Sequence, residues 1–448
     1  MLSQDERIVF RRLGVFAGGF TPEAVEGIFN GTVDLSFDPL EVIVSLLDKS
    51  LLSAVEEHTS DPWQEIKREE GSAASLYSEA RFAVLETVRE YALEQLSEEG
   101  EVEWAQRQHA IFFMELAEQA EPELKGPNQA GWLARLEREY SNIRAALSWS
   151  SDYDAEITIR LMYALMRFWY IRGHYAEGSE WLEKVLAKGD DVPVLLRAKA
   201  LRASSSFAHR QGNQGLGESY LEESVALAHR AGDKALISDV QGQLGYVLLE
   251  QGDRKRAKAL FEECLMLDRE LGDKYGICWL LTALGEVARS EEDYAQSREY
   301  YEEGLLLARE AENKYNVAHL VGNLGAVALA EGDNGAATSL IVGSLVLVRE
   351  LGYRPGIVAC LTRFAAVAVA LGKPGRAAKL SGAVGRVLET SDVRIDAVDE
   401  RIYEQYLGRA REQLGEEEFE KSWAEGQAME LEEAIEYALE GIEIDVSR

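Results

Sequence analysis

The segment Leu244-Gly245-Tyr246-Val247-Leu248-Leu249-Glu250-Gln251-Gly252-Asp253 contains landmarks that return along the chain at a forty-residue interval. Its closing Gln-Gly-Asp turn has equivalents at Gln211-Gly212-Asn213, Glu291-Glu292-Asp293, Glu331-Gly332-Asp333 and Leu371-Gly372-Lys373. A second turn with the same interval occurs at Ala231-Gly232-Asp233, Leu271-Gly272-Asp273, Ala311-Glu312-Asn313 and Leu351-Gly352-Tyr353. The opening Leu-Gly pair returns at Leu284-Gly285 and Leu324-Gly325. Three patterns in phase predict a helical solenoid, an architecture that presents an extended binding surface.

Each forty-residue unit is predicted to contain two helices of roughly 17 residues, about 25 Å long at 1.5 Å per residue. In one unit these helices are Ala235–Glu250 and Arg254–Leu271. The Gly-Asp turns supply a left-handed residue that ends one helix and a cap that begins the next. A glycine inside a helix, such as Gly245 or Gly285, costs about 1 kcal/mol relative to alanine. We therefore expect these glycines to permit a close approach of the paired helix.

The units resemble tetratricopeptide repeats in a longer, forty-residue form. The family places a small residue after Leu in the first helix, an alanine early in the second helix and aromatic residues between them. The matching residues are Gly245 with Ala257 and Phe261, Gly285 with Ala295 and Tyr301, and Gly325 with Ala336. The expected units are 153–190, 192–232, 233–272, 273–312, 313–352 and 353–390. The resemblance implies a mainly α protein, with a right-handed superhelix of about six helical hairpins over residues 153–390.

The chain on either side of the repeats has its own pattern. Residues 391–448 are predicted to be capping helices, Arg394–Gly415 and one or two within Glu416–Leu439, because a solenoid needs its last apolar face covered. Phe419 and Trp423 should fold against the last helix pair. Residues 1–100 are predicted to form a small winged-helix-like α/β domain, followed by a helical connector over residues 101–152. The expected elements are helices Asp5–Val15, Pro22–Phe29, Leu40–Asp48 and Thr87–Glu98, strands Leu51–Val55 and Arg81–Leu85, and connector helices Gln106–Gln119 and Trp132–Trp149.

The composition restricts the classes of function. The formal net charge is −32, and residues 1–100 hold 8 Lys and Arg against 20 Asp and Glu, which disfavours direct nucleic-acid binding. No run of apolar residues is long enough to span a membrane, and the N-terminus has no signal-peptide pattern. The three cysteines, Cys264, Cys278 and Cys360, have no zinc-site spacing and fall at apolar helix positions, so we expect buried thiols. We expect a cytoplasmic protein without a membrane partner.

Several stretches resemble the C-terminal arm of bacterial signal-transduction ATPase regulators of the LuxR/AfsR kind. They are Arg11–Thr21, Leu47–Leu51, Phe82–Ala92, Trp132–Leu147 and Leu414–Gly426. In that family a nucleotide-binding domain precedes the winged helix, and the repeats form a sensor arm that controls it. The resemblance therefore implies an ATPase domain as partner, in cis or in trans. It also implies that this chain is the C-terminal arm of a larger regulator or the product of a truncated gene.

The chain departs from the nucleotide-binding members of that family. It has no GxxxxGK[ST] motif, and Gly18-Gly19 is not followed by Lys-Ser. Many relatives carry Met-His-Asp before the last helix of the winged domain, and its histidine contacts nucleotide. The aligned residues here are Val84-Leu85-Glu86, and Leu85 cannot donate a hydrogen bond. We therefore predict that the chain binds no ATP and no other cofactor.

No catalytic or metal-binding constellation is evident. The six histidines are scattered over different predicted helices without an HExxH pair. Carboxylate pairs such as Glu262-Glu263 and Glu302-Glu303 recur at one repeat position, as a solvated helix face would. The sequence therefore predicts a protein that is not an enzyme.

The inner wall of the repeats is the candidate binding surface, because in tetratricopeptide arrays it is lined by the first helix of each unit. Fixed offsets from the small residue select Lys199, Arg202, His209, Arg210, Asp239, Tyr246, Glu250, Trp279, Glu286, Arg289 and His319. A bland interpretation, in which each is simply a solvated helix residue, remains open. The basic cluster of Lys199, Arg202 and Arg210 points to an acidic peptide or an anionic ligand, with Trp279 as an aromatic anchor.

The sequence thus predicts a non-enzymatic sensor arm of a transcriptional regulator that binds a protein or peptide segment, or a small effector. Two alternatives stay open. The chain could be a free-standing tetratricopeptide scaffold with no role in transcription, or a DNA-binding protein that uses its winged helix.

Overall fold

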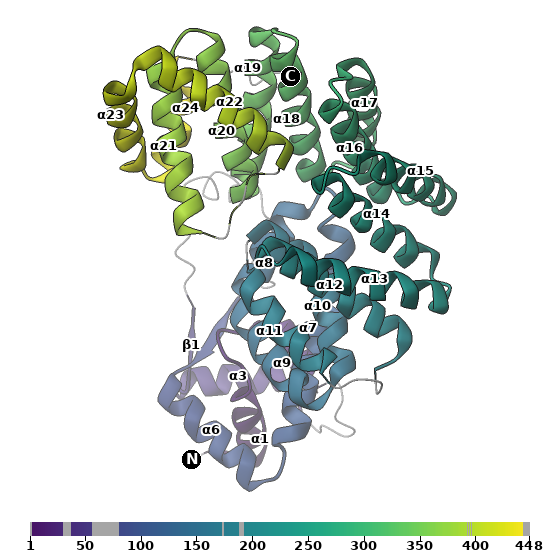
Figure 1. Cartoon of the computed structure of the whole chain (residues 1–448). Coiled ribbons are helices and arrows are strands. Elements are labelled where there is room, and N and C mark those ends of the chain that lie inside the picture. Colours follow the sequence, from purple (N-terminus) through teal and green to yellow (C-terminus); the bar gives the residue numbers. More distant parts are fainter. Residues whose placement is uncertain are drawn as a thin grey trace. The chain divides into compact units, whose positions relative to one another are not determined.

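The computed structural model describes residues 2–29, 37–55, 80–172, 174–187, 192–391, 393, 395 and 397–441 (Figure 1). The chain forms two compact units. The first comprises residues 1–120, 134–165 and 181–189, and the second comprises residues 121–133, 166–180 and 190–448. Among the described residues, no helix combines the length and the apolar character that crossing a membrane requires.

The N-terminal part of the chain has, over the described part of residues 1–100, the element order that the sequence predicts. Its elements are α1 (Gln4–Leu13), α2 (Pro22–Phe29), α3 (Pro39–Asp48), β1 (Leu52–Ala54), β2 (Phe82–Val84), α6 (Glu86–Glu98), α7 (Val102–Glu123), α8 (Gln129–Arg138), α9 (Tyr140–Tyr153), α10 (Ala155–Arg172) and α11 (Tyr175–Leu186). Strands β1 and β2 are antiparallel, and Phe20 forms an isolated bridge with Phe82. The polar stretch expected between the strands, around Asp61-Pro62 and Gly71-Ser72, lies outside the described residues.

The expected single helix Trp132–Trp149 is wrong, because two helices, α8 and α9, occupy this stretch and meet at Glu139. Glu139 is buried and forms an ion pair with Arg81 next to β2. The backbone of Glu139 has φ −87° and ψ 0°, which are not the dihedral angles of an α-helix. The helix is therefore interrupted at this residue. The tertiary ion pair holds Glu139 in the first unit, and sequence periodicity carries no signal for such a contact.

The loop after α1 is held by polar side chains from distant parts of the first unit. Asn142 accepts a hydrogen bond from the Ala17 amide at 3.0 Å and donates one to the Gly19 carbonyl at 2.9 Å. Arg89 donates through Nε to the Phe16 carbonyl at 2.6 Å. Three of the stretches that carry the sequence resemblance therefore meet at this loop.

The repeats form five consecutive helical hairpins in the second unit. Their helices are α12 (Val194–Arg210), α13 (Gln214–Ala231), α14 (Lys234–Glu250), α15 (Arg254–Leu271), α16 (Lys274–Ser290), α17 (Tyr294–Glu310), α18 (Lys314–Ala330), α19 (Asn334–Glu350), α20 (Arg354–Ala370) and α21 (Pro374–Thr390). Each helix packs on the next, and α14, α16, α18 and α20 also contact one another in succession. Because helices come closer on the concave side of a curved stack, these first helices of each hairpin line the inner wall.

The glycines inside the first helices permit a close approach, as expected. A Cβ at Gly285 would lie 2.2 Å from the ring of Tyr301, and one at Gly245 would lie 2.7 Å from the ring of Phe261. Both rings are fully buried. Each glycine thus receives an aromatic side chain of the second helix in its own hairpin.

The turns between helices use left-handed residues throughout. The glycines have positive φ, for example 87° at Gly252 and 71° at Gly272. Where the repeat has glutamate instead, Glu292 and Glu312 adopt φ of 62° and 50°. Aspartates such as Asp253 then cap the following helix through the side chain. The turns therefore keep a left-handed residue even at the two positions where glutamate replaces glycine.

The cysteines are buried and free, as predicted. Cys278 donates through Sγ to the Gly304 carbonyl at 3.5 Å, and Ser344 makes the equivalent contact to the Ala318 carbonyl at 2.8 Å one unit later. Burial raises the pKa of the Cys278 thiol to about 12. These thiols pack between successive units.

Three helices close the array: α22 (Ala397–Leu414), α23 (Glu416–Gln427) and α24 (Leu431–Leu439). The expected start at Arg394 lies outside the described residues. Helix α22 packs on α20 and α21, and α23 packs on α21, as Figure 1 also shows. Phe419 is fully buried, and Trp423 lies against Gly385. The expectation that this segment folds against the last helix pair is confirmed.

Candidate functional site: the inner wall of the repeats

Several of the inner-wall residues selected from the sequence pair with one another across neighbouring hairpins. Arg202 on α12 forms a two-pronged ion pair with Asp239 on α14, with both N–O distances 2.9 Å. Arg202 is only 7% exposed, so its charge is neutralised inside the wall. His209 and Glu250 make the next such contact, 2.7 Å between Nε2 and Oε2.

Lys199 of the expected basic cluster and the expected aromatic anchor Trp279 lie elsewhere. Trp279 covers Gly242, packs against the core and has its ring centroid 6.5 Å from that of Tyr246. Lys199 is half-buried on α12, and the side chain of Arg210 lies outside the described residues. The structure therefore does not bring Lys199, Arg202 and Trp279 together in one cavity among the described residues.

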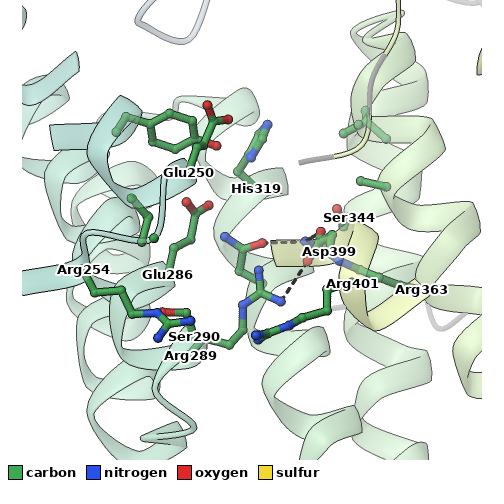
Figure 2. A pocket seen from close by; sticks show the side chains of 17 residues that line it. Glu250, Arg254, Glu286, Arg289, Ser290, His319, Ser344, Arg363, Asp399 and Arg401 are labelled. Atoms are coloured by element: carbon green, nitrogen blue, oxygen red, sulfur yellow. Dashed lines mark hydrogen bonds and ion pairs between the residues drawn. The ribbon is translucent and has the colours of Figure 1, made fainter. Parts of the chain in front are cut away.

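Five of the selected residues do come together in a pocket of about 190 Å³ on the inner wall. They are Tyr246, Glu250, Glu286, Arg289 and His319, from the successive inner helices α14, α16 and α18. Figure 2 shows the charged side chains around this space. Other residues complete the lining, and the offsets did not predict Arg254, Asn323, Arg363, Asp399 or Arg401.

Asp399 from the capping helix α22 lies between two arginines of the inner wall. Its Oδ1 is 2.8 Å from Nη1 of Arg289, and its Oδ2 is 2.7 Å from Nη2 of Arg363. Burial alone would raise the pKa of Asp399, but the charges of Arg363 and Arg289 hold that pKa well below its usual range. Burial likewise opposes the charge on Arg289, whereas Asp399 raises its pKa. Asp399 and Arg289 are thus charged.

Sequence signals existed for part of this arrangement. Arg363 is the one charged residue between Pro355 and Ala370 in the otherwise apolar helix α20, and a buried arginine requires a partner. Counting fixed offsets from the small residue missed Arg363, because it lies next to a selected position and not on it. Asp399 carries no comparable signal, since it lies in a segment without periodicity.

One end of the wall is covered by an aromatic cluster in the second unit. The ring of His319 packs against that of Tyr315 with centroids 4.5 Å apart and a tilt of 36°, and His319 also lines the pocket. The Arg167 guanidinium lies 4.0 Å from the ring centroid of Tyr315, and Tyr170 stacks on Tyr353 at 6.0 Å. The C-terminal half of α10 therefore packs on the same helices that form the pocket.

The pocket is small, is lined by charged side chains and is built by several helices of the array and the cap. Among the residues that the structure describes, no group of His, Cys, Asp and Glu is arranged to hold a metal ion.

Known proteins are similar to this chain in sequence or in fold. A model of the tetratricopeptide repeat family matches residues 238–271, which span most of α14 and all of α15. Proteins of Mycobacterium tuberculosis and Mycobacterium bovis named as HTH-type transcriptional regulators are 30% identical over 247 residues. That alignment covers 53% of this chain and 26% of each relative, so the chain matches about a quarter of the length of these curated relatives.

A solved structure shares this fold. A Rap protein complexed with competence and sporulation factor aligns over 72% of this chain and 99% of its own, with 12% identity and a TM-score of 0.50. A signal transduction ATPase with numerous domains and a tetratricopeptide repeat sensor, from Pyrococcus horikoshii, aligns over 97% of this chain and 65% of its own. Its identity is 14% and its TM-score 0.48. The chain therefore carries a tetratricopeptide-type solenoid and is homologous to proteins named as transcriptional regulators.

Proposed function

We propose that this chain is the non-enzymatic sensor arm of a bacterial transcriptional regulator of the LuxR/AfsR kind. It binds a protein segment or a small effector on the inner wall of its repeats, in the cytoplasm. An ATPase domain, in cis or in trans, receives the signal. The chain itself makes no direct contact with nucleic acid.

The observation that carries this proposal is the pocket formed by α14, α16, α18, α20 and α22. Its lining combines side chains of four successive inner helices with the cap, so a bound ligand contacts several repeats at once. A ligand that bridges repeats can change their relative stability, which is how binding in a solenoid reaches distant parts. The homology to proteins named as regulators supports the transcriptional role.

The proposal is tested by thermal unfolding of the full chain with a bacterial extract filtered to retain only small peptides and metabolites. We expect the extract to raise the unfolding temperature of the wild type, because a ligand that binds only the folded state stabilises it. Glu286→Gln, which alters the pocket, should reduce this rise.

A matched control is Glu302→Gln, the same change at an exposed position on α17. It should respond to the extract as the wild type does. Unfolding without extract shows whether either variant has a folding defect. No rise in the wild type, or equal rises in both variants, would contradict a ligand site at this pocket.

A further inference from the structure

The pocket is unusually rich in arginine for a chain with a net charge of −32. Arg254 on α15, Arg289 on α16, Arg363 on α20 and Arg401 on α22 all line it. Asp399 pairs with two of them, Arg289 and Arg363. Neither Arg254 nor Arg401 has an ion-pair partner within the part of the chain that the structure describes. The pocket thus has four arginines against three carboxylates, those of Glu250, Glu286 and Asp399, and two of the arginines have no ion-pair partner among the described residues.

The buried polar groups of the pocket show the same imbalance. Nε of Arg289 is buried and donates to no acceptor among the described residues, and the same holds for Nε of Arg363 and Nδ2 of Asn323. Arg289 as a whole is only 5% exposed. Buried N–H groups without an acceptor are costly and rare in folded proteins. An environment with unused donors and spare positive charge favours a ligand that brings acceptors and negative charge.

The arginines gather in one part of the pocket. In Figure 2 the side chains of Arg254, Arg289 and Arg401 lie toward one end, Glu250 and His319 lie toward the other, and Glu286 lies between them. Oε2 of Glu250 lies 2.7 Å from Nε2 of His209, away from the arginines. An anionic group would therefore be attracted to the arginine end of the pocket.

We infer that Arg254, Arg289 and Arg401 form a site for an anionic group of the ligand, a carboxylate or a phosphate. This inference rests on the proposed function, and it names the chemistry that the pocket selects. Guanidinium groups suit such oxygens because their N–H donors match them in pairs. Ligand pockets for drug-sized molecules usually measure about 300–1,000 Å³, so a pocket of about 190 Å³ holds one such group. The rest of the ligand lies along the inner wall.

The sequence placed the anionic ligand at Lys199, Arg202 and Arg210. The structure favours the same chemistry at a different place. Arg202 is neutralised by Asp239, whereas Arg254 and Arg401 keep their charge available at the pocket.

The test is calorimetry on the full chain at low ionic strength, with four probes. These are inorganic phosphate, succinate, a short Gly-Ser peptide with a free C-terminal carboxylate, and the same peptide ending in an amide. We expect at least one anionic probe to bind the wild type, with an affinity that falls as salt is added. The variant Arg254→Gln with Arg401→Gln should bind that probe at least tenfold more weakly.

The matched control is Arg256→Gln with Arg409→Gln, which removes two arginines from the same two helices outside the pocket. It should bind like the wild type. If no anionic probe binds the wild type, or if both double variants bind equally well, the anion site is rejected. Preference for phosphate or for the carboxylates tells which source of negative charge the pocket accepts.

The extract experiment separates this inference from the proposed function. Stabilisation by extract that survives in Arg254→Gln with Arg401→Gln would retain the sensor function and reject the anion site. Selective binding of an anionic probe without any response of the wild type to extract would support the anion site and count against the sensor function.

Discussion

Asp399, in the first turn of the capping helix α22, forms a buried ion pair with Arg289 at the far end of α16, with an O–N distance of 2.8 Å. The cap therefore does more than cover the last hairpin: it places a carboxylate on the inner wall two hairpins earlier. Arg363 on α20 binds the other carboxylate oxygen at 2.7 Å. One side chain of the cap thus connects the third and the fifth of the five hairpins.

Replacing Asp399 by asparagine should destabilise the second unit by about 3–5 kcal/mol, because it leaves Arg289 and Arg363 buried without a counter-charge. The measurement is urea unfolding at neutral pH. Glu400→Gln, at the exposed neighbouring position, is the control and should leave the free energy of unfolding unchanged. Equal stability of Asp399→Asn and wild type would mean that the ion pair contributes nothing.

The same pair predicts a pH dependence. The pKa of Asp399 lies well below its ordinary value in the folded state. The stabilisation that the Asp399 carboxylate gives the folded state is therefore fully present above its pKa in the unfolded chain, about 4. It is lost as the pH falls from there toward the folded pKa. The difference in stability between wild type and Asp399→Asn should therefore narrow between pH 5 and strongly acidic pH, but not between pH 5 and 8.

Gly285→Ala should destabilise the array by about 1–3 kcal/mol, because the added methyl group would overlap the buried ring of Tyr301. Thermal or urea unfolding measures this loss. Gly215→Ala on α13 provides the control, since no atom lies within 4 Å of the position where its Cβ would be. Alanine favours helix there, so the control should be as stable as the wild type or slightly more stable.

Glu292→Gly and Glu312→Gly should each stabilise the protein by about 0.5–1 kcal/mol. Both residues adopt left-handed backbone conformations that cost a side chain about 1–2 kcal/mol, and glycine recovers most of this despite its greater freedom in the unfolded chain. The reverse change, Gly252→Glu at φ 87°, is the control and should destabilise. A loss of stability on Glu292→Gly would show that its side chain makes a contribution larger than the strain.

Much of the repeat fold could be predicted because the signals for it are local. The helix expected at Arg254–Leu271 has those bounds in the structure, and the one expected at Ala235–Glu250 begins one residue earlier. A left-handed turn residue and an aspartate cap determine these ends, and both are visible in the sequence. The break at Glu139 could not be predicted in this way, since it accompanies an ion pair with Arg81, far away in the sequence.

The pocket could be predicted only in part, for a similar reason. Periodicity tells which side chains face the inner wall, and it found Glu286, Arg289 and His319. Periodicity does not tell which of these side chains have their charge neutralised by a neighbour, as the charge of Arg202 is by Asp239. It is also silent about Asp399, because the cap has no repeat register.

The full chain should not shift a DNA duplex in a gel at low salt. Helix α3 (Pro39–Asp48), which would have to enter the groove, has no Lys or Arg, and Lys49 just beyond it pairs with Glu6. Non-specific affinity depends mainly on neutralising phosphates. A salt-sensitive shift would favour the alternative in which the winged domain binds DNA.

The capping helices should be sensitive to single methyl groups where α23 crosses α21. A Cβ at Gly426 would lie 1.9 Å from the Lys379 carbonyl oxygen, and one at Gly382 would lie 2.1 Å from the Trp423 carbonyl oxygen. Backbone atoms cannot yield as a flexible side chain can. Gly426→Ala should therefore force α23 away from α21 and lower the unfolding temperature, whereas Gly408→Ala on α22, where the Cβ meets open space, should not.

Undocking α23 would uncover Phe419 and the apolar surface of the last hairpin, so Gly426→Ala should also increase binding of a hydrophobic dye at temperatures below unfolding. Deletion of residues 416–448 removes the whole contact and should destabilise the array further. Binding of an anionic probe at Arg254 should survive in Gly426→Ala below its unfolding temperature, because α23 contributes no residue to that pocket. Loss of probe binding from a variant that melts like the wild type would instead identify the C-terminal helices as the binding element.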